Sequence, residues 1–244
     1  MVYAIIPAAG IGSRMQSSIP KQYLPLSGST VLLHSVRAIL ALPQVSRVVI
    51  ALHQADTWWP ESRQQLTADE LQRVQICEGG AERWQSVRAA LQCLGNQAAN
   101  NEWVLIHDAA RPCVRREDLL ALIKSCETGT GSASGGLLAV PVSDTLKRAD
   151  VHLSVQATVD RSQLWAACTP QMFRARDLLL ALEHCADQGI SVTDESSAME
   201  FCGEKPQLIA CHKDNIKITY PEDLQLAEWI LRDRRQSSTL LNGA

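Results

Sequence analysis

The sequence predicts an α/β fold: a doubly wound, Rossmann-like and mostly parallel sheet flanked by helices, with a protruding β-arm. Two observations predict it. Short apolar, β-branched runs alternate along the chain with segments whose apolar residues recur every three or four positions. Several of the runs are apolar on both faces, which is typical of strands that helices cover on both sides. In such sheets, ligands bind at the carboxyl ends of the strands.

The expected core elements follow in chain order. Strands are expected at 2–6, 45–52, 73–78, 103–110 and 135–142, with helices at 30–42 and 81–94 among the segments between them. Segment 143–170 alternates polar and apolar residues and contains no glycine. We therefore expect a β-hairpin or arm there, inserted between core elements.

The C-terminal part predicts two helices, a strand pair and a last helix. The helices are expected at about 175–187 and from near Asp194, the strand pair at 207–219, and the last helix from Pro221. The polar end lacks periodicity. We expect one domain over 1–235, with the arm at about 143–170 and a flexible tail at 236–244.

Bulk composition limits the classes of function. The chain has 244 residues, a net charge of −3 and no long block of one sign, which argues against nucleic acid bound on a broad basic face. Its eight cysteines include no C-x-x-C pair, and we expect reduced thiols in a cytoplasmic protein. We find no export signal or 18-residue apolar span, so we expect no membrane association.

The stretch PAAGIGSRMQSSIPKQYLPL, residues 7–26, follows the first strand. It lacks the third glycine of a dinucleotide fingerprint and the G-K-[ST] of a P-loop. Its glycines Gly10 and Gly12 let the main chain approach a ligand, and Arg14 and Lys21 supply positive potential for polyphosphate oxygens. The alternative is a plain strand–helix turn with two solvated cations.

Two further loops follow expected strands. HDAARP (107–112) places Asp108 at the carboxyl end of a central strand with Arg111 three residues later, although Asp108 could instead cap the next helix and pair with Arg111. EGGAERWQSV (78–87) offers Gly79 and Gly80 for close approach, or an ordinary turn. His107 is the one histidine of interest, because the six histidines lack metal-ligand spacing.

Cations and hydroxyls also recur in three later segments: 143–148, 158–171 and 214–219. Their side chains could neutralise and hydrogen-bond a second phosphate, or could belong to a solvated surface. The residues concerned are Thr145, Lys147, Arg161, Thr169 and Lys217.

Taken together and in this order, PAAGIGSRM...PKQYLPL, HDAARPC, VPVSDTLKR, TVDRSQLWAACTPQMF, TDESSAMEFCG and DNIKIT.PEDL resemble the 2-C-methyl-D-erythritol 4-phosphate cytidylyltransferases of the bacterial non-mevalonate isoprenoid pathway. The resemblance covers nearly the whole chain. Ribitol-phosphate cytidylyltransferases share much of it, so ribitol 5-phosphate or another sugar phosphate is the alternative substrate. A dinucleotide-binding oxidoreductase and a nucleotide-binding module without turnover are the more distant alternatives.

The resemblance implies a reaction and a nucleotide site. The substrate phosphate attacks the α-phosphorus of CTP and pyrophosphate leaves, so the chemistry depends on positioning and electrostatics. A Mg²⁺ ion is expected, held mainly by the CTP phosphates and water. Arg14 and Lys21 would stabilise the reacting α-phosphate. The implied CTP site consists of Pro7, Ala8, Ala9, Gly10, Gly12, Gly80, Ala81, Ser86 and Asp108.

The resemblance also implies an acceptor site and a homodimer. The family's arm crosses to a second subunit and would carry Thr145 and Arg161 into the neighbour's site. Two positions depart from the family pattern: Ala81 replaces a frequent acidic residue, and Ser13 replaces a common basic one. The implied acceptor contacts are Asp108, Ala109, Arg111, Thr145, Arg161, Thr169 and Lys217.

Overall fold

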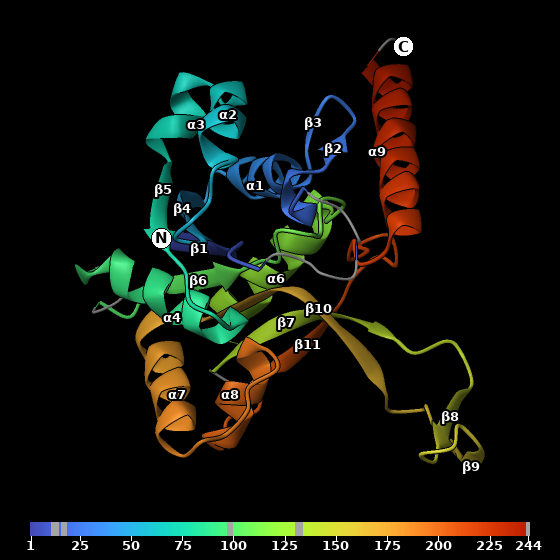
Figure 1. Cartoon of the computed structure of the whole chain (residues 1–244). Helices are drawn as coiled ribbons and strands as arrows, with labels where there is room; N and C mark the ends of the chain where they lie inside the picture. The colour runs from blue at the N-terminus through green and yellow to red at the C-terminus, as the bar shows by residue number, and fades with distance from the viewer. Residues whose placement is uncertain (11–14, 16–18, 97–99, 130–133, 243–244) are drawn as a thin grey trace.

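A seven-stranded sheet forms the centre of the molecule (Figure 1). The computed structural model describes residues 1–10, 15, 19–96, 100–129 and 134–242. Across the sheet the strand order is β11-β7-β10-β6-β1-β4-β5. In chain order these strands are β1 (Val2–Pro7), β4 (Val45–Leu52), β5 (Val74–Glu78), β6 (Trp103–Ile106), β7 (Gly135–Pro141), β10 (Trp165–Arg174) and β11 (Gln207–Ala210).

Strand direction confirms the mostly parallel sheet. β1 runs parallel to β4 and β6, β4 to β5, and β7 to β11. β10 is antiparallel to both of its neighbours, β6 and β7. The carboxyl ends of β1, β4, β5 and β6 therefore meet at one edge, where the loops that follow them come together.

Helices cover both faces of the sheet, as the apolar strands predicted. Alternate residues of β1 show the two sides: Ala4 and Ile6 pack with α1 and α6, while Tyr3 and Ile5 pack with α4, α7 and α8. In Figure 1, α7 and α8 lie together on the side of the sheet opposite α1. The helices are α1 (Val31–Leu40), α2 (Trp59–Ser62), α3 (Ala68–Gln72), α4 (Arg83–Leu94), α6 (Arg116–Thr128), α7 (Ala175–Asp187), α8 (Glu195–Phe201) and α9 (Pro221–Asn242).

The arm is a smaller hairpin than the sequence predicted. β8 (Leu146–Ala149) and β9 (Val155–Val159) pair antiparallel and project away from the sheet (Figure 1). The prediction was wrong for the end of segment 143–170, because 165–170 belong to β10. The start of β10 is exposed like the arm, yet Trp165–Ala167 pair with the end of β7.

Three other boundaries differ from the sequence prediction. The strand expected at 103–110 ends at Ile106. The strand pair at 207–219 is wrong, since only β11 forms; the chain then turns, and Ile218 N–H donates to Ala110 O at 2.9 Å instead of joining a ladder. α9 begins at Pro221 as predicted but stays helical to Asn242, within the segment expected to be a tail.

The remaining described elements are short. They are the 3₁₀ helices at Lys21–Tyr23 and Arg63–Gln65 and the strands β2 (Pro25–Leu26) and β3 (Ser29–Thr30). The described helices include none with the length and apolar character that a membrane crossing requires.

Candidate active site

The first loop of the site continues β1. Ala8 N–H donates to Ala51 O at 2.8 Å, which extends the strand pairing by one residue, and the Ala8 carbonyl accepts from the buried Gln22 amide at 2.8 Å. The chain beyond this fixed corner is exposed at Gly10. Gly12, Ser13 and Arg14, which the sequence placed in the same loop, lie outside the described residues.

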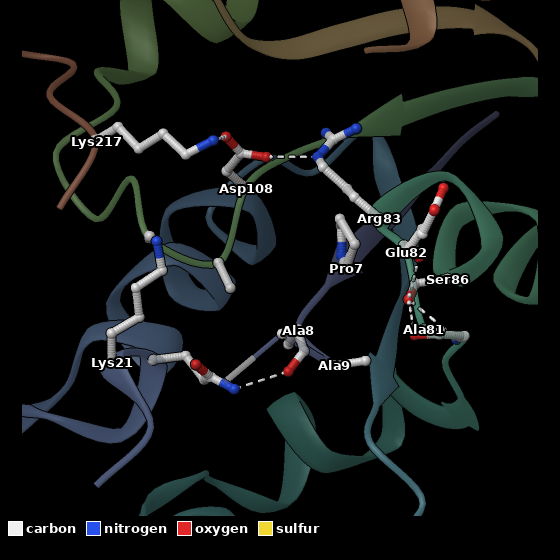
Figure 2. A pocket seen from close by; sticks show the side chains of 15 residues that line it. Pro7, Ala8, Ala9, Lys21, Ala81, Glu82, Arg83, Ser86, Asp108 and Lys217 are labelled. Carbon is white, nitrogen blue, oxygen red and sulfur yellow. Dashed lines mark hydrogen bonds and ion pairs between the residues drawn. The ribbon is translucent and has the colours of Figure 1, made fainter. Parts of the chain in front are cut away.

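Lys21 opens the short helix after that loop. Its ammonium donates to Ile218 O at 3.2 Å, so the side chain spans from the first loop to the segment before α9. Figure 2 shows Lys21 on the same side of the site as Lys217. Two ammonium groups from distant parts of the chain thus face one region, which suits an anionic ligand.

A second loop connects β5 to α4. The Ser86 hydroxyl is buried and accepts the Gly80 N–H at 3.1 Å, which fixes the loop from the first turns of α4. A Cβ on Gly79 would lie 2.7 Å from the Ala9 Cβ. Glycine at position 79 is therefore required for the close contact between these two loops, whereas the sequence suggested it for approach to a ligand or for an ordinary turn.

A cleft, partly open to solvent, lies between these loops. Gln22, Glu82 and Arg83 line it together with residues the sequence singled out. Those predicted residues are Pro7, Ala8, Ala9, Gly10, Lys21, Gly80, Ala81, Ser86, Asp108, Ala109 and Lys217.

Asp108 is the centre of the charged part of the site. Its buried carboxylate accepts from Arg83 Nε at 3.0 Å and lies 2.8 Å from Lys217 Nζ and 3.6 Å from Arg111 Nε. Burial raises the pKa of Asp108, but Arg83, Lys217 and Arg111 outweigh it and hold that pKa well below its usual range. Of the structural alternative, the ion pair with Arg111 is confirmed, but the helix cap is wrong, because the next described helix begins only at Arg116.

His107 and Thr169 support Asp108 from the interior. The Thr169 hydroxyl accepts the Asp108 N–H at 3.0 Å and donates to His107 Nδ1 at 3.1 Å, while His107 Nε2–H donates to Arg111 O at 3.0 Å. This network assigns to His107 the neutral tautomer with its proton on Nε2. Burial lowers the pKa of His107 to about 4, so it is uncharged at neutral pH. The Thr169 hydroxyl thus donates to His107 and accepts from Asp108 in this structure. The phosphate contact expected of Thr169 stays a prediction.

A second pocket, open to solvent, adjoins the first. Arg83, Asp108 and Lys217 line both pockets and so form a shared wall. Figure 2 shows Lys217 and Arg83 reaching Asp108 from opposite sides. The rest of the second pocket includes Arg111, Cys168, Thr169 and Asp194.

Thr145 and Arg161 are not brought to either pocket within one chain. Thr145 lies just before β8 and Arg161 just after β9, both exposed, and the Arg161 guanidinium donates to Ser143 O. The arm that carries them points away from the sheet (Figure 1). Their role as acceptor contacts stays a prediction.

Sequence reasoning missed Arg83 and Glu195. Arg83 lies three residues after the Gly-Gly pair in GGAERW, a stretch with turn chemistry. Glu195 follows Asp194 in TDESS, where the sequence predicts a helix start and part of the family resemblance but no role for this residue. In the structure Arg83 bonds both Asp108 and Glu195. A charged residue within three positions after paired strand-end glycines is the signal that could have found Arg83.

A Rossmann-like sheet, two strand-end loops with a glycine-dependent contact and a cation-lined cleft define a protein of the nucleotidyltransferase class. The family model described as "IspD: 2-C-methyl-D-erythritol 4-phosphate cytidylyltransferase" matches residues 2–233. The chain belongs to this family.

Individual relatives agree over nearly the full length. Cytidylyltransferases of this name from Vibrio atlanticus and Klebsiella pneumoniae are 45% and 47% identical to the chain; each alignment covers 96% of this chain, and 97% and 96% of the respective relative. The crystal structure of the Francisella tularensis protein of this name is similar with a TM-score of 0.79 and 35% identity, over 94% of this chain and 99% of that one.

Proposed function

We propose that this chain transfers the cytidylyl group of CTP to 2-C-methyl-D-erythritol 4-phosphate, giving 4-diphosphocytidyl-2-C-methyl-D-erythritol and pyrophosphate in isoprenoid precursor synthesis. The observation that carries the proposal is the wall of Arg83, Asp108 and Lys217 between two adjoining pockets. Such a wall lets a nucleotide and an anionic acceptor lie side by side. The relatives described above carry the methylerythritol name, which favours this acceptor over ribitol 5-phosphate.

CTP is assigned to the pocket between the two strand-end loops. The main chain at Gly80, held by Ser86, offers fixed backbone groups to the cytosine. Pro7 ends β1, and Ala8 and Ala9 follow it with small side chains, so the triphosphate can pass close to the backbone. Lys21 lies where it can stabilise charge that develops on the α-phosphate.

The acceptor is assigned to the second pocket, where Arg111 and Lys217 offset the charge of its phosphate. A phosphate monoester is already an anionic nucleophile at neutral pH, so the reaction requires no general base. The buried, uncharged His107 fits this requirement, because it holds Thr169 and the Arg111 carbonyl in place. Catalysis then rests on orientation and charge stabilisation.

Magnesium is proposed as the cofactor. Within the described part of the chain, no three His, Cys, Asp or Glu side chains cluster as a metal site, and the Asp108 carboxylate is already bonded to Arg83 and Lys217. The residues that line the cleft therefore fit a magnesium ion that is held mainly by triphosphate oxygens and water, because Mg²⁺ gives up its water ligands reluctantly. When bound, the ion supplies charge neutralisation to the triphosphate.

A homodimer through the arm is also proposed, because Arg161 directly follows β9 of the projecting hairpin and lines neither of the two pockets of its own chain. Mixing subunits tests it: K21A and R161A proteins, each impaired alone, should regain activity after unfolding and joint refolding. In a symmetric dimer about a quarter of the sites are then intact. Mixtures no more active than their components would contradict the exchange of arms.

A cytoplasmic location is inferred from the cysteines. All eight, each within the described residues, are free thiols, as is usual in a reducing compartment.

The decisive assay for the proposed reaction follows pyrophosphate release from purified protein, CTP and Mg²⁺ with each candidate acceptor. Release is expected with 2-C-methyl-D-erythritol 4-phosphate and at least tenfold less with ribitol 5-phosphate or with UTP in place of CTP. Equal or faster release with ribitol 5-phosphate would assign the alternative acceptor, and no release with any phosphate would contradict the proposed function.

A further inference from the structure

Arg83 joins the two pockets to a carboxylate that belongs to neither. Its Nη1 and Nη2 bond the two oxygens of Glu195 at 2.5 and 3.1 Å, and its Nε bonds Asp108 at 3.0 Å. A guanidinium bonded on two edges has little freedom to rotate. The two bonds to Glu195 therefore fix the direction in which Nε points, which is toward Asp108.

Glu195 has the properties of a fixed anchor. It is the first residue of α8 and only 1% exposed, and neither pocket includes it among its lining residues. The start of α8 is itself tied to the sheet, because Gln171 of β10 accepts Ser196 N–H at 2.7 Å and donates to Asp194 at 2.8 Å. A buried carboxylate costs desolvation energy, so the pair by itself is weak evidence for a role in stability.

We infer that Glu195 is a positioning residue for the acceptor phosphate: it holds Arg83, and through Arg83 it fixes Asp108 and the Lys217 ammonium at the wall between the pockets. The inference rests on the proposed function for its substrate. Glu195 touches neither substrate and acts only through Arg83.

The charge of Glu195 and its positioning of Arg83 predict opposite effects of a substitution on acceptor binding. The ion-paired cluster holds three cations (Arg83, Arg111 and Lys217) and two carboxylates (Asp108 and Glu195), so it carries one positive charge in excess. Removing the charge of Glu195 makes the cluster more positive, which by Coulomb attraction alone would tighten an anionic acceptor. If Glu195 positions Arg83, the same change loosens the wall and weakens the acceptor.

The test compares E195Q and E195D with wild type by steady-state kinetics in both substrates. E195D keeps the charge and withdraws the carboxylate by one methylene, so it isolates position from charge. For both variants we expect kcat/KM for the acceptor to fall about 10- to 100-fold, since misplacement by about 1 Å can cost 10²-fold. The KM for CTP should stay within about threefold, because CTP is held mainly by the two loops.

Matched controls separate positioning from general damage. E70Q removes the charge from another arginine–carboxylate pair, Arg37–Glu70 at 3.1 Å, which lies outside both pockets, and should leave both KM values unchanged. R83Q should match the acceptor defect of E195Q, and the double variant R83Q/E195Q should be no worse than R83Q alone. Additive losses in the double variant would overturn the inference.

Two further results would overturn the inference without touching the proposed function. One is wild-type or higher acceptor kcat/KM in E195Q. The other is a crystal structure of E195Q in which Arg83 Nε still bonds Asp108; we expect that bond to be lost. If wild-type protein itself releases no pyrophosphate, the proposed function fails, and the crystal structure still decides whether Glu195 holds Arg83.

Discussion

The Lys217 ammonium lies 2.8 Å from an Asp108 carboxylate oxygen, at the wall that the two pockets share. Asp108 follows a central strand, whereas Lys217 lies in the turn before the last helix. The contact brings a cation from the end of the chain to the carboxyl edge of the sheet. It orients the ammonium between the positions assigned to nucleotide and acceptor.

Lys217→Met should raise the KM for the acceptor about tenfold or more while changing the KM for CTP less, because a charge-assisted contact to the phosphate contributes roughly 1.5–3 kcal/mol. Steady-state kinetics with each substrate varied in turn measures this. Lys213→Met, an exposed lysine in the same turn, is the matched control and should behave as wild type. An increase confined to the KM for CTP would give Lys217 a nucleotide role instead.

Lys21→Ala should lower kcat about 10²-fold or more, since one lost charge-stabilising contact in the transition state is worth roughly 3 kcal/mol. The melting temperature should change little, because the Lys21 side chain is a partly exposed group at the edge of the cleft. Lys124→Ala on α6 controls for loss of a surface lysine. Wild-type turnover in Lys21→Ala would remove this residue from the mechanism.

Ser86→Ala should raise the KM for CTP about fivefold, because the Gly80 N–H loses a hydrogen bond worth about 1 kcal/mol and the loop is no longer fixed. Isothermal titration with CTP measures the affinity directly. Ser125→Ala removes a comparable hydrogen bond, from Ser125 Oγ to Gln207 at 2.8 Å, away from the cleft. Equal CTP affinities for wild type and Ser86→Ala would show that the loop keeps its shape without the serine.

Folding stability should fall as pH drops from 6.5 toward 4 because of His107. Burial lowers its pKa from 6.5 to about 4, so in this window the unfolded chain binds a proton that the folded chain does not. The loss is at most about 3 kcal/mol, at about 1.4 kcal/mol per pH unit. Urea unfolding at several pH values gives the free energy of unfolding as a function of pH. This free energy should change less steeply with pH for His107→Gln than for wild type, and identical pH dependences would contradict the assignment.

The sequence predicted the regular core because local patterns determine it. The strand at 45–52 and the helix at 175–187 agree with β4 and α7, where apolar spacing matches the strand and helix periods. β10 was misjudged at its start, because pairing with β7 is a long-range property that alternation alone does not encode. The turn after β11 was likewise mistaken for a strand.

The sequence predicted the site residues that lie in loops at strand ends. It was less informative for residues whose place in the site depends on tertiary contacts. The loops containing Ala9, Gly80 and Asp108 converge as expected, because parallel strands end at one edge. The ion pairs of Arg83 with Glu195 and of Lys217 with Asp108 depend on how α8 and the last turn pack against the sheet. Spacing along the chain carries no signal for such contacts.

The most direct measurement is a crystal structure of this protein with CTP and Mg²⁺. The proposed mechanism predicts cytosine against Gly80 and its Ser86-held loop, the triphosphate beside Ala8 with the Lys21 ammonium within hydrogen-bond distance of a phosphate oxygen, and the second pocket left for the acceptor. Nucleotide bound in the pocket of Arg111 and Thr169, or a Lys21 side chain directed away from the phosphates, would contradict it.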